Sequence, residues 1–147
     1  MKKFIFSLDK VLSYKEEVQE GIQQEYAVLV KRVQRQEDKV RDLETEYQAL
    51  SAKLEKEKRS GCNIMNIRMY EAYFTSLDGR IKEGKQILVG LQRIAEKKRQ
   101  ELVDAKVETS AIQKLKEKKL KDYEQEMQKK EEQSIEEFIS NSTISAR

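Results

Sequence analysis

A strict alternation of four- and three-residue steps runs through residues 22–54 and constrains the fold more than any other feature of this chain. Nine of the ten positions on this stripe are apolar or Tyr, whereas the 37% hydrophobic composition predicts about four by chance. A stripe that repeats every 3.5 residues indicates a left-handed coiled coil, which needs a partner stripe to cover it. Its positions are Ile22, Tyr26, Leu29, Val33, Gln36, Val40, Leu43, Tyr47, Leu50 and Leu54.

A matching stripe follows in the same chain, where ten of thirteen positions between residues 70 and 112 are apolar or Tyr. When the chain is folded back at Cys62, the two stripes face each other in mirror order. The residues around that point are Ser60-Gly61-Cys62-Asn63. Gly tolerates the positive φ that ends a helix, and Asn is a good N-cap for the next helix. The second stripe comprises Tyr70, Phe74, Leu77, Ile81, Gly84, Leu88, Leu91, Ala95, Lys98, Leu102, Ala105, Thr109 and Ile112.

The predicted fold is therefore all-α, a long antiparallel two-helix coiled-coil hairpin with an overhanging C-terminal helix. The absence of Pro permits long unbroken helices. The alternative is two separate helices that pair with other copies, but closing a short loop costs little entropy and favours the hairpin. We expect a single coiled-coil domain over 1–147, with helix one over about 8–58, a turn over 59–63, helix two over about 64–140 and a frayed tail over 141–147.

The second helix is expected to extend beyond its partner. Leu8, near the start of the first helix, lies opposite Lys116 in the mirror order, so everything after Lys116 overhangs. About 25 residues of helix, or roughly 35 Å, would lie there. Its apolar residues have no partner within the hairpin, and they are Leu120, Tyr123, Met127, Ile135, Phe138 and Ile139.

Gln36 and Gly84 interrupt the two stripes. A polar residue in a coiled-coil seam fixes the register at a cost in stability, although a tolerated edge residue explains Gln36 as well. Gly84 faces Val40, so close approach of the two backbones is a reason for its presence. Gly90 also lies within the second helix, without a reason that the sequence shows.

Composition argues against several classes of function. The net charge of +3 is too balanced to indicate nucleic-acid binding, and the absence of His removes the commonest metal ligand and general base. No phosphate-binding loop or nucleophile with its base is present, and a two-helix fold lacks the pocket that a small-molecule substrate needs. We therefore expect no enzymatic activity, no cofactor and no metal.

The single Cys62 cannot form an internal disulfide, and its place at the turn predicts an exposed thiol. An unpaired thiol fits a reducing cytosol better than an oxidising compartment. Basic runs at 97–99 and 114–119 are typical of solvated helix faces, and the alternative is a docking stripe for an acidic partner.

Aromatic residues are dense near the turn, where Tyr47, Tyr70, Tyr73 and Phe74 gather with several Ile and Met residues. Tyr73 lies off the stripe, so its ring is expected to be partly exposed. Clustered aromatics at one end of a highly charged helix pair indicate a protein-binding site, although they also serve to close the end of the hairpin.

Three segments, in their order and spacing, resemble the flagellar export protein FliJ family over nearly the whole chain. They read FIFSLDKVLSYKEE at the start, SGCNIMNIRMYEAYFTSLDGRI around the turn and IQKLKEKKLKDYEQEM late in the chain. The resemblance implies a cytoplasmic component of the flagellar type III export apparatus, with a two-helix coil similar to the central stalk of the γ subunit in rotary ATPases.

The resemblance also implies partners and contact residues. The termini end would insert into the ring of the export ATPase hexamer, through Leu8, Val11, Leu12, Tyr123 and Met127. The aromatic region would bind the cytoplasmic domain of the membrane export gate, through Tyr47, Tyr73, Phe74 and Leu77. The family also handles export chaperones, and the protein would lie at the cytoplasmic face of the membrane and be a monomer when free. The stripes alone leave open a generic self-associating coiled-coil scaffold.

Overall fold

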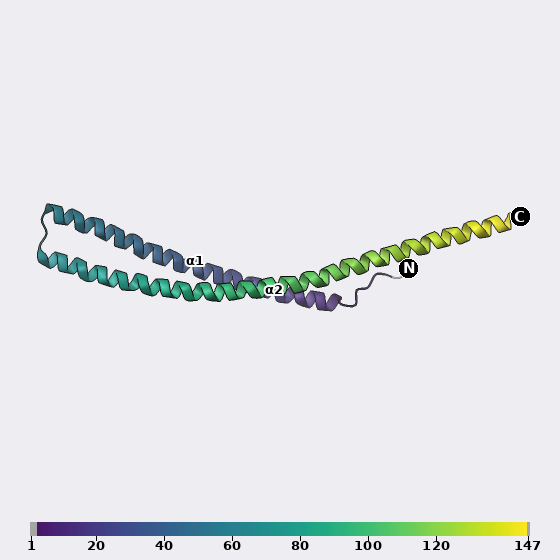
Figure 1. Ribbon diagram of the computed structural model, residues 1–147, viewed down its shortest axis with the longest axis horizontal. Coiled ribbons are helices and arrows are strands. Elements are labelled where there is room, and N and C mark those ends of the chain that lie inside the picture. Colours follow the sequence, from purple (N-terminus) through teal and green to yellow (C-terminus); the bar gives the residue numbers. More distant parts are fainter. Residues whose placement is uncertain (1–2, 147) are drawn as a thin grey trace. The chain divides into compact units, whose positions relative to one another are not determined.

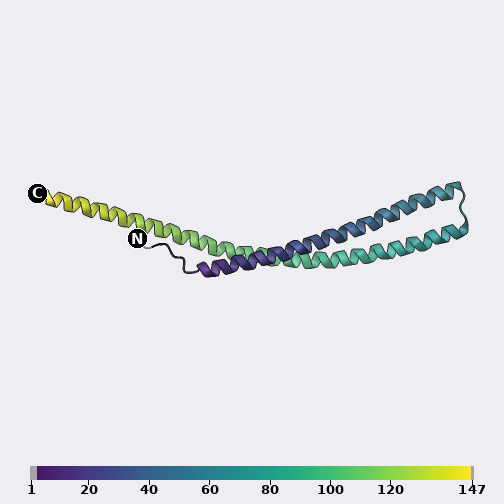
Figure 2. The ribbon, with the colours of Figure 1, turned by 180° about the vertical axis from the view of Figure 1, so that it is seen from behind.

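The structure is a computed structural model that describes residues 3–146, and these form two α-helices without any strand. Helix α1 spans Asp9–Ser60 and α2 spans Ile64–Ser145 (Figure 1). Residues 61–63 connect them, and the two helices lie side by side in opposite directions near this connection in both views (Figure 2). The predicted helical hairpin is confirmed.

The second helix ends later than expected, at Ser145 instead of near residue 140, and fraying of the tail over 141–147 stays a prediction. Residues 141–145 are helical, and Arg147, like Met1 and Lys2, lies outside the described residues. Hydroxyl groups in this last part of α2 bond to carbonyls one turn back, with Thr143 Oγ1 2.8 Å from Ile139 O and Ser145 Oγ 2.8 Å from Asn141 O. Both hydroxyl groups are therefore satisfied within the helix.

The contacts divide the chain into two compact units, which are described separately. The turn unit is Gly21–Leu102, and the termini unit combines Met1–Glu20 with Val103–Arg147. Each unit pairs a segment of α1 with a segment of α2. The single domain over 1–147 stays a prediction.

The core of the turn unit is the predicted seam. Leu77 has no exposed surface, and Val40, Ile81 and Leu102 are also buried. The remaining seam positions are half-buried, except that Gly84 is buried and Tyr47 is exposed, and most residues between them are exposed. Each fully buried aliphatic side chain contributes roughly 1.5–3 kcal/mol, so this narrow seam holds the two helices together.

The two helices approach each other closely at Gly84. A Cβ atom built on Gly84 would lie 3.1 Å from Cγ2 of Val40, as their facing positions predict. Gln36 Nε2 donates a hydrogen bond to the carbonyl oxygen of Gly84 at 3.0 Å. This bond crosses the seam and favours the interpretation of Gln36 as a register-fixing residue.

The turn has the predicted chemistry. Gly61 adopts φ 91°, and the side-chain oxygen of Asn63 accepts a hydrogen bond from the Met65 N–H at 3.3 Å, as an N-cap does. The expectation that Cys62 is exposed is wrong, because the residue is half-buried. Its Sγ lies 3.6 Å from the Asn63 carbonyl oxygen and 4.0 Å from the Glu57 carboxylate.

The termini unit has a shorter core, which includes Leu12 and Thr109. The Thr109 hydroxyl, although buried, bonds to the Ala105 carbonyl oxygen at 2.9 Å. Two ion pairs of 2.8 Å cross between the helices, Lys15 with Glu108 and Lys116 with Asp9. The mirror order of the two stripes therefore continues into this unit.

A non-helical segment at residues 3–8, which we call the N-terminal strap, lies against α2. The ring of Phe4 packs on that of Tyr123 at 5.6 Å between centroids, and Phe6 is buried. The overhanging residue Tyr123 therefore does have a partner in this chain. The sequence places Phe4 and Phe6 near the overhanging helix as surface for another protein to cover, and in the structure Phe4 instead packs on Tyr123.

Within the described residues, neither helix combines the length and apolar character that crossing a membrane requires.

Replacing Gly90 and Gly84 with Ala should have different effects on stability. Gly90 has nothing within 4 Å of a built Cβ, so Gly90→Ala should stabilise the helix by up to about 1 kcal/mol. Gly84→Ala would press a methyl group against Val40, whose β-branched side chain is stiff, and should give no gain or a loss. Thermal unfolding followed by circular dichroism compares the two variants, and an equal gain for both would contradict the close approach.

Candidate functional site

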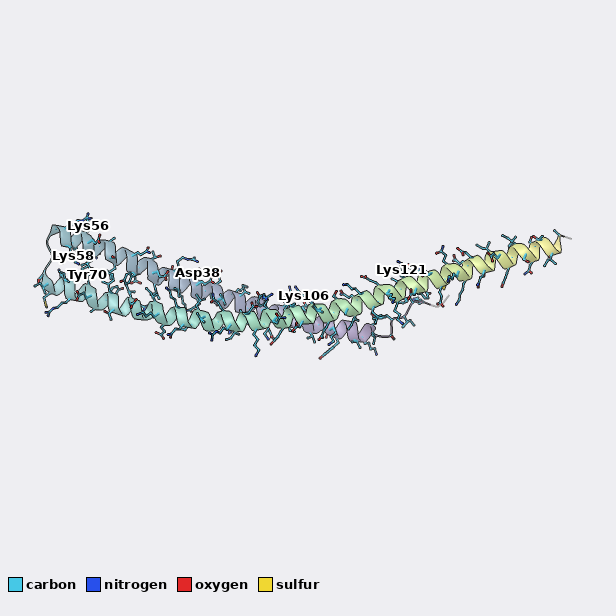
Figure 3. The ribbon with its side chains drawn as sticks, viewed as in Figure 1. Asp38, Lys56, Lys58, Tyr70, Lys106 and Lys121 are labelled. Carbon is cyan, nitrogen blue, oxygen red and sulfur yellow. The ribbon has the colours of Figure 1, made fainter. Side chains whose placement is uncertain are left out.

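A groove in the turn unit is the first candidate surface. It has a volume of about 630 Å³ and lies between α1 and α2 near the turn. Figure 3 labels Tyr70 on α2 in this region, with Lys56 and Lys58 near the end of α1. The groove combines apolar, aromatic and acidic side chains, which include Ala49, Leu50, Met69, Tyr70, Tyr73, Glu46 and Glu57.

An aromatic pair that joins the two helices lies next to this groove. The rings of Tyr47 and Phe74 meet edge to face, with 4.9 Å between centroids and 64° between planes. Tyr47 is exposed and Phe74 is half-buried, whereas Leu77, one turn further along α2, is fully buried. Three of the four residues predicted to bind the export gate thus lie close together at the surface or just below it, and Leu77 packs in the core.

Tyr73 offers the most accessible ring of the four predicted residues, with 43% of the residue exposed. Its hydroxyl donates a hydrogen bond to the Glu46 carboxylate on α1. This bond, together with the negative charge of Glu46, raises the pKa of Tyr73. The phenol is therefore held in a fixed position with one side of its ring open to solvent.

Tyr70 lies deeper in the groove than Tyr73. Its burial, followed by a hydrogen bond to the Glu57 carboxylate, raises the pKa of Tyr70. On the outer side, Met69 is highly exposed, as are Ile64 and Met65. Aromatic rings and Met side chains at an accessible surface favour protein binding, because both supply large contact area.

The residues predicted to contact the export ATPase lie in the termini unit. Leu8 and Val11 are exposed, Leu12 is buried, and Tyr123 and Met127 are half-buried. A groove of about 930 Å³ runs between the N-terminal strap and α2, with Phe4, Tyr123 and Met127 in its walls. The structure brings Tyr123 and Met127 together with the strap.

The sequence analysis missed the two carboxylates that hold the tyrosine hydroxyls. A signal for Glu46 was present, because Glu46 and Tyr73 each immediately precede a seam residue. Positions that flank a seam can pair across a coiled coil, but the mirror order sets Glu46 opposite Asp78, so it indicates only that Glu46 and Tyr73 lie on the flanks of the seam. Among the described residues, no group of His, Cys, Asp and Glu is arranged to hold a metal ion.

Comparison with known proteins identifies similar chains. The family model described as "Flagellar FliJ protein" matches residues 4–147. The Flagellar FliJ protein of Bacillus subtilis (strain 168) is 23% identical over 139 residues, which cover 91% of this chain and 95% of that protein. No solved structure matches the chain at a significant level. The similarity thus extends over both helices and the turn.

Glu46→Gln should lower the pKa of Tyr73 toward its ordinary value of 10.0, because the substitution removes the negative charge beside the hydroxyl. A raised pKa in the folded state means that this contact stabilises the fold below about pH 10 and ceases to do so as pH rises through the folded pKa. An NMR titration of ring-labelled Tyr, with Tyr73→Phe to assign the signal, measures the change. Glu55→Gln is the control, and an equal pKa in both variants would contradict the contact.

Proposed function

Because the chain belongs to the FliJ family, we propose that it acts as a stalk-like component of the flagellar type III protein export apparatus. The observation that carries this proposal is the family match over residues 4–147, which includes every contact residue named above. The family is a non-enzymatic component of flagellar export. In this role the protein acts by binding other proteins.

The first proposed partner is the cytoplasmic domain of the membrane export gate, bound at the aromatic surface of the turn unit. Tyr47, Tyr73 and Phe74 supply ring surface there, and Leu77 supports Phe74 from the core. The geometry supports such a role because the hydroxyl of Tyr73 is already fixed by Glu46. A fixed ring loses little conformational entropy when a partner covers it.

The second proposed partner is the ring of the export ATPase hexamer, bound by the termini unit. Leu8 and Val11 offer exposed aliphatic surface, and buried Leu12 holds that part of α1 against α2. Tyr123 and Met127 contribute from α2, beside the N-terminal strap. In the proposed role, this contact promotes assembly and activity of the ATPase.

The proposal includes three further points that rest on the family alone. The protein handles empty export chaperones between rounds of export. It is located in the cytoplasm and at the cytoplasmic face of the membrane, where the gate domain lies, and is a monomer when free.

Addition of the purified protein should raise the ATP hydrolysis rate of the cognate export ATPase. The physical reason is that a stalk bound within the ring favours the assembled hexamer. Phosphate release measured at increasing protein concentration tests this, and light scattering should give the mass of one chain in the free protein. If the protein neither binds nor stimulates the ATPase and is an obligate dimer, these results would instead indicate a self-associating scaffold.

Tyr73→Ala should weaken binding of the export-gate domain about tenfold or more, as the loss of an interface tyrosine commonly does. Helix content should not change, because the ring is partly exposed. Isothermal titration calorimetry with the purified gate domain measures the affinity. Val89→Ala is the matched control, since Val89 is similarly exposed on α2 in the same unit. Equal affinity of both variants would place the gate contact elsewhere.

A further inference from the structure

Contacts that cross between the helices mark one flank of the turn unit. The Tyr73 hydroxyl on α2 bonds to the Glu46 carboxylate on α1. Lys98 on α2 pairs with Glu25 on α1 at 2.8 Å and with Glu101 on its own helix at 2.9 Å. Glu25 and Glu46 are separated by a multiple of seven residues, and the same is true of Tyr73 and Glu101. Steps of seven residues therefore stay on this one flank along both helices.

Between these contacts, every position at a seven-residue step is basic or apolar. We call these positions the basic flank, and they are Arg32 and Lys39 on α1 with Arg80, Ile87 and Ile94 on α2. All five residues are exposed, with 49% of Ile87 and 53% of Ile94 accessible to solvent. Within residues 3–146, none of the three cationic side chains forms an ion pair. The basic flank thus presents three positive charges beside two exposed aliphatic side chains.

The residues next to the basic flank do not cancel its charge. Positions three residues further along the chain lie on the same side of each helix. The charged residues at these positions are two basic and two acidic ones, Arg35, Lys97, Asp42 and Glu83. Because these charges balance, the three positive charges of the basic flank remain as the net charge of this surface.

Gly90 lies at one of these neighbouring positions, between Ile87 and Ile94. Its spacing of three and four residues from them places all three residues on one face of α2. Nothing lies within 4 Å of a Cβ atom built on Gly90, so the space between the two isoleucine side chains is open. Both side chains are therefore accessible to a surface that approaches this flank.

From this combination we infer that the basic flank lies against a membrane surface that contains anionic lipid. Lys and Arg side chains are attracted to acidic head groups, and aliphatic side chains enter the boundary between head groups and acyl chains. The cytoplasmic leaflet carries such lipids, so its charge is complementary to that of the flank. The inference rests on the location at the cytoplasmic face of the membrane that is proposed above, and it supplies a physical contact for that location.

Two other occupants fit the basic flank less well. A nucleic acid would bind the cations through its phosphates, but its backbone offers no apolar surface to the two isoleucines. An acidic helix of another protein needs carboxylates in register with the cations, which are spread along the unit, with Arg32 and Lys39 about 10 Å apart. A lipid surface presents negative charge over its whole area and apolar chains just beneath it, so it complements both kinds of side chain.

The test is co-sedimentation of the full-length chain with vesicles. One set of vesicles contains equal parts of phosphatidylglycerol and phosphatidylcholine, and the other contains phosphatidylcholine alone. The wild-type chain should bind the anionic vesicles and not the neutral ones. Binding should weaken as salt is added, because salt screens the attraction between exposed charges.

A first pair of variants tests the charge. Arg32→Gln with Lys39→Gln should lower the partition coefficient about twentyfold, since each basic residue near an anionic surface contributes roughly fivefold. The matched control is Lys31→Gln with Lys58→Gln, which removes the same charge from exposed positions of α1 that lie off the flank. An equal loss in both pairs would reflect overall charge alone and would overturn the inference.

A second pair of variants tests the apolar contact. Ile87→Ala with Ile94→Ala should lower the partition coefficient at least about fivefold, because less apolar surface is buried in the interface. Val30→Ala with Val89→Ala is the control, since these residues are similarly exposed in the turn unit but lie off the flank. Circular dichroism should show unchanged helix content in all four variants.

The outcomes separate this inference from the other proposed contacts. If the wild-type chain does not bind anionic vesicles, or if the flank variants bind as the wild type does, the inference is overturned. The gate and ATPase contacts are unaffected by this result, because they are tested with purified proteins. Binding of a DNA duplex that depends on Arg32 and Lys39 but not on the isoleucines, without vesicle binding, would assign the flank to nucleic acid and would also overturn the inference.

Discussion

The packing of one apolar stripe against its mirror image determines the rest of this structure. The buried side chains of the turn unit, such as Leu77 and Val40, come from this seam, and the termini unit repeats the arrangement around Leu12 and Thr109. Because the seam is narrow, most side chains of both helices face solvent. Any functional contact must therefore be made by side chains that flank the seam or by the regions where the pairing of the two helices ends.

Both candidate surfaces lie at such positions, one on the flank of the seam near the turn and one where the helix pairing ends in the termini unit. Near the turn, carboxylates of α1 hold the hydroxyl groups of Tyr70 and Tyr73, which leaves ring surface available beside a groove. In the termini unit, α1 begins at Asp9, and the N-terminal strap that precedes it packs on α2. Both places combine exposed apolar side chains with aromatic rings and a groove, which favours protein binding there.

The sequence predicted the seam, the turn and the all-α fold because both signals are local. A 3.5-residue repeat indicates paired helices, and the residues Gly61–Asn63 indicate the end of one helix and the start of the next. It placed Phe4 and Phe6 near the overhanging helix, but it could not predict that the N-terminal strap packs on Tyr123, because residues 3–8 have no helical period and their position depends on which face of α2 stays uncovered. The end of the second helix was placed near residue 140 because a Ser-rich chain end is commonly frayed, whereas the helix continues to Ser145 with the Thr143 and Ser145 hydroxyls bonded within it. Glu46 was missed because only seam positions were paired.

The hydrogen bond from Gln36 to the Gly84 carbonyl has a mechanical consequence. Sliding one helix along the other by a heptad, about 10 Å, would bring Gln36 opposite a position where a leucine side chain shields the backbone. The amide would then lose its partner in a partly buried site, at a cost of roughly 1–3 kcal/mol. The hydrogen bond therefore opposes sliding of the two helices of the turn unit along each other. A force along the axis of one helix is then transmitted to the other.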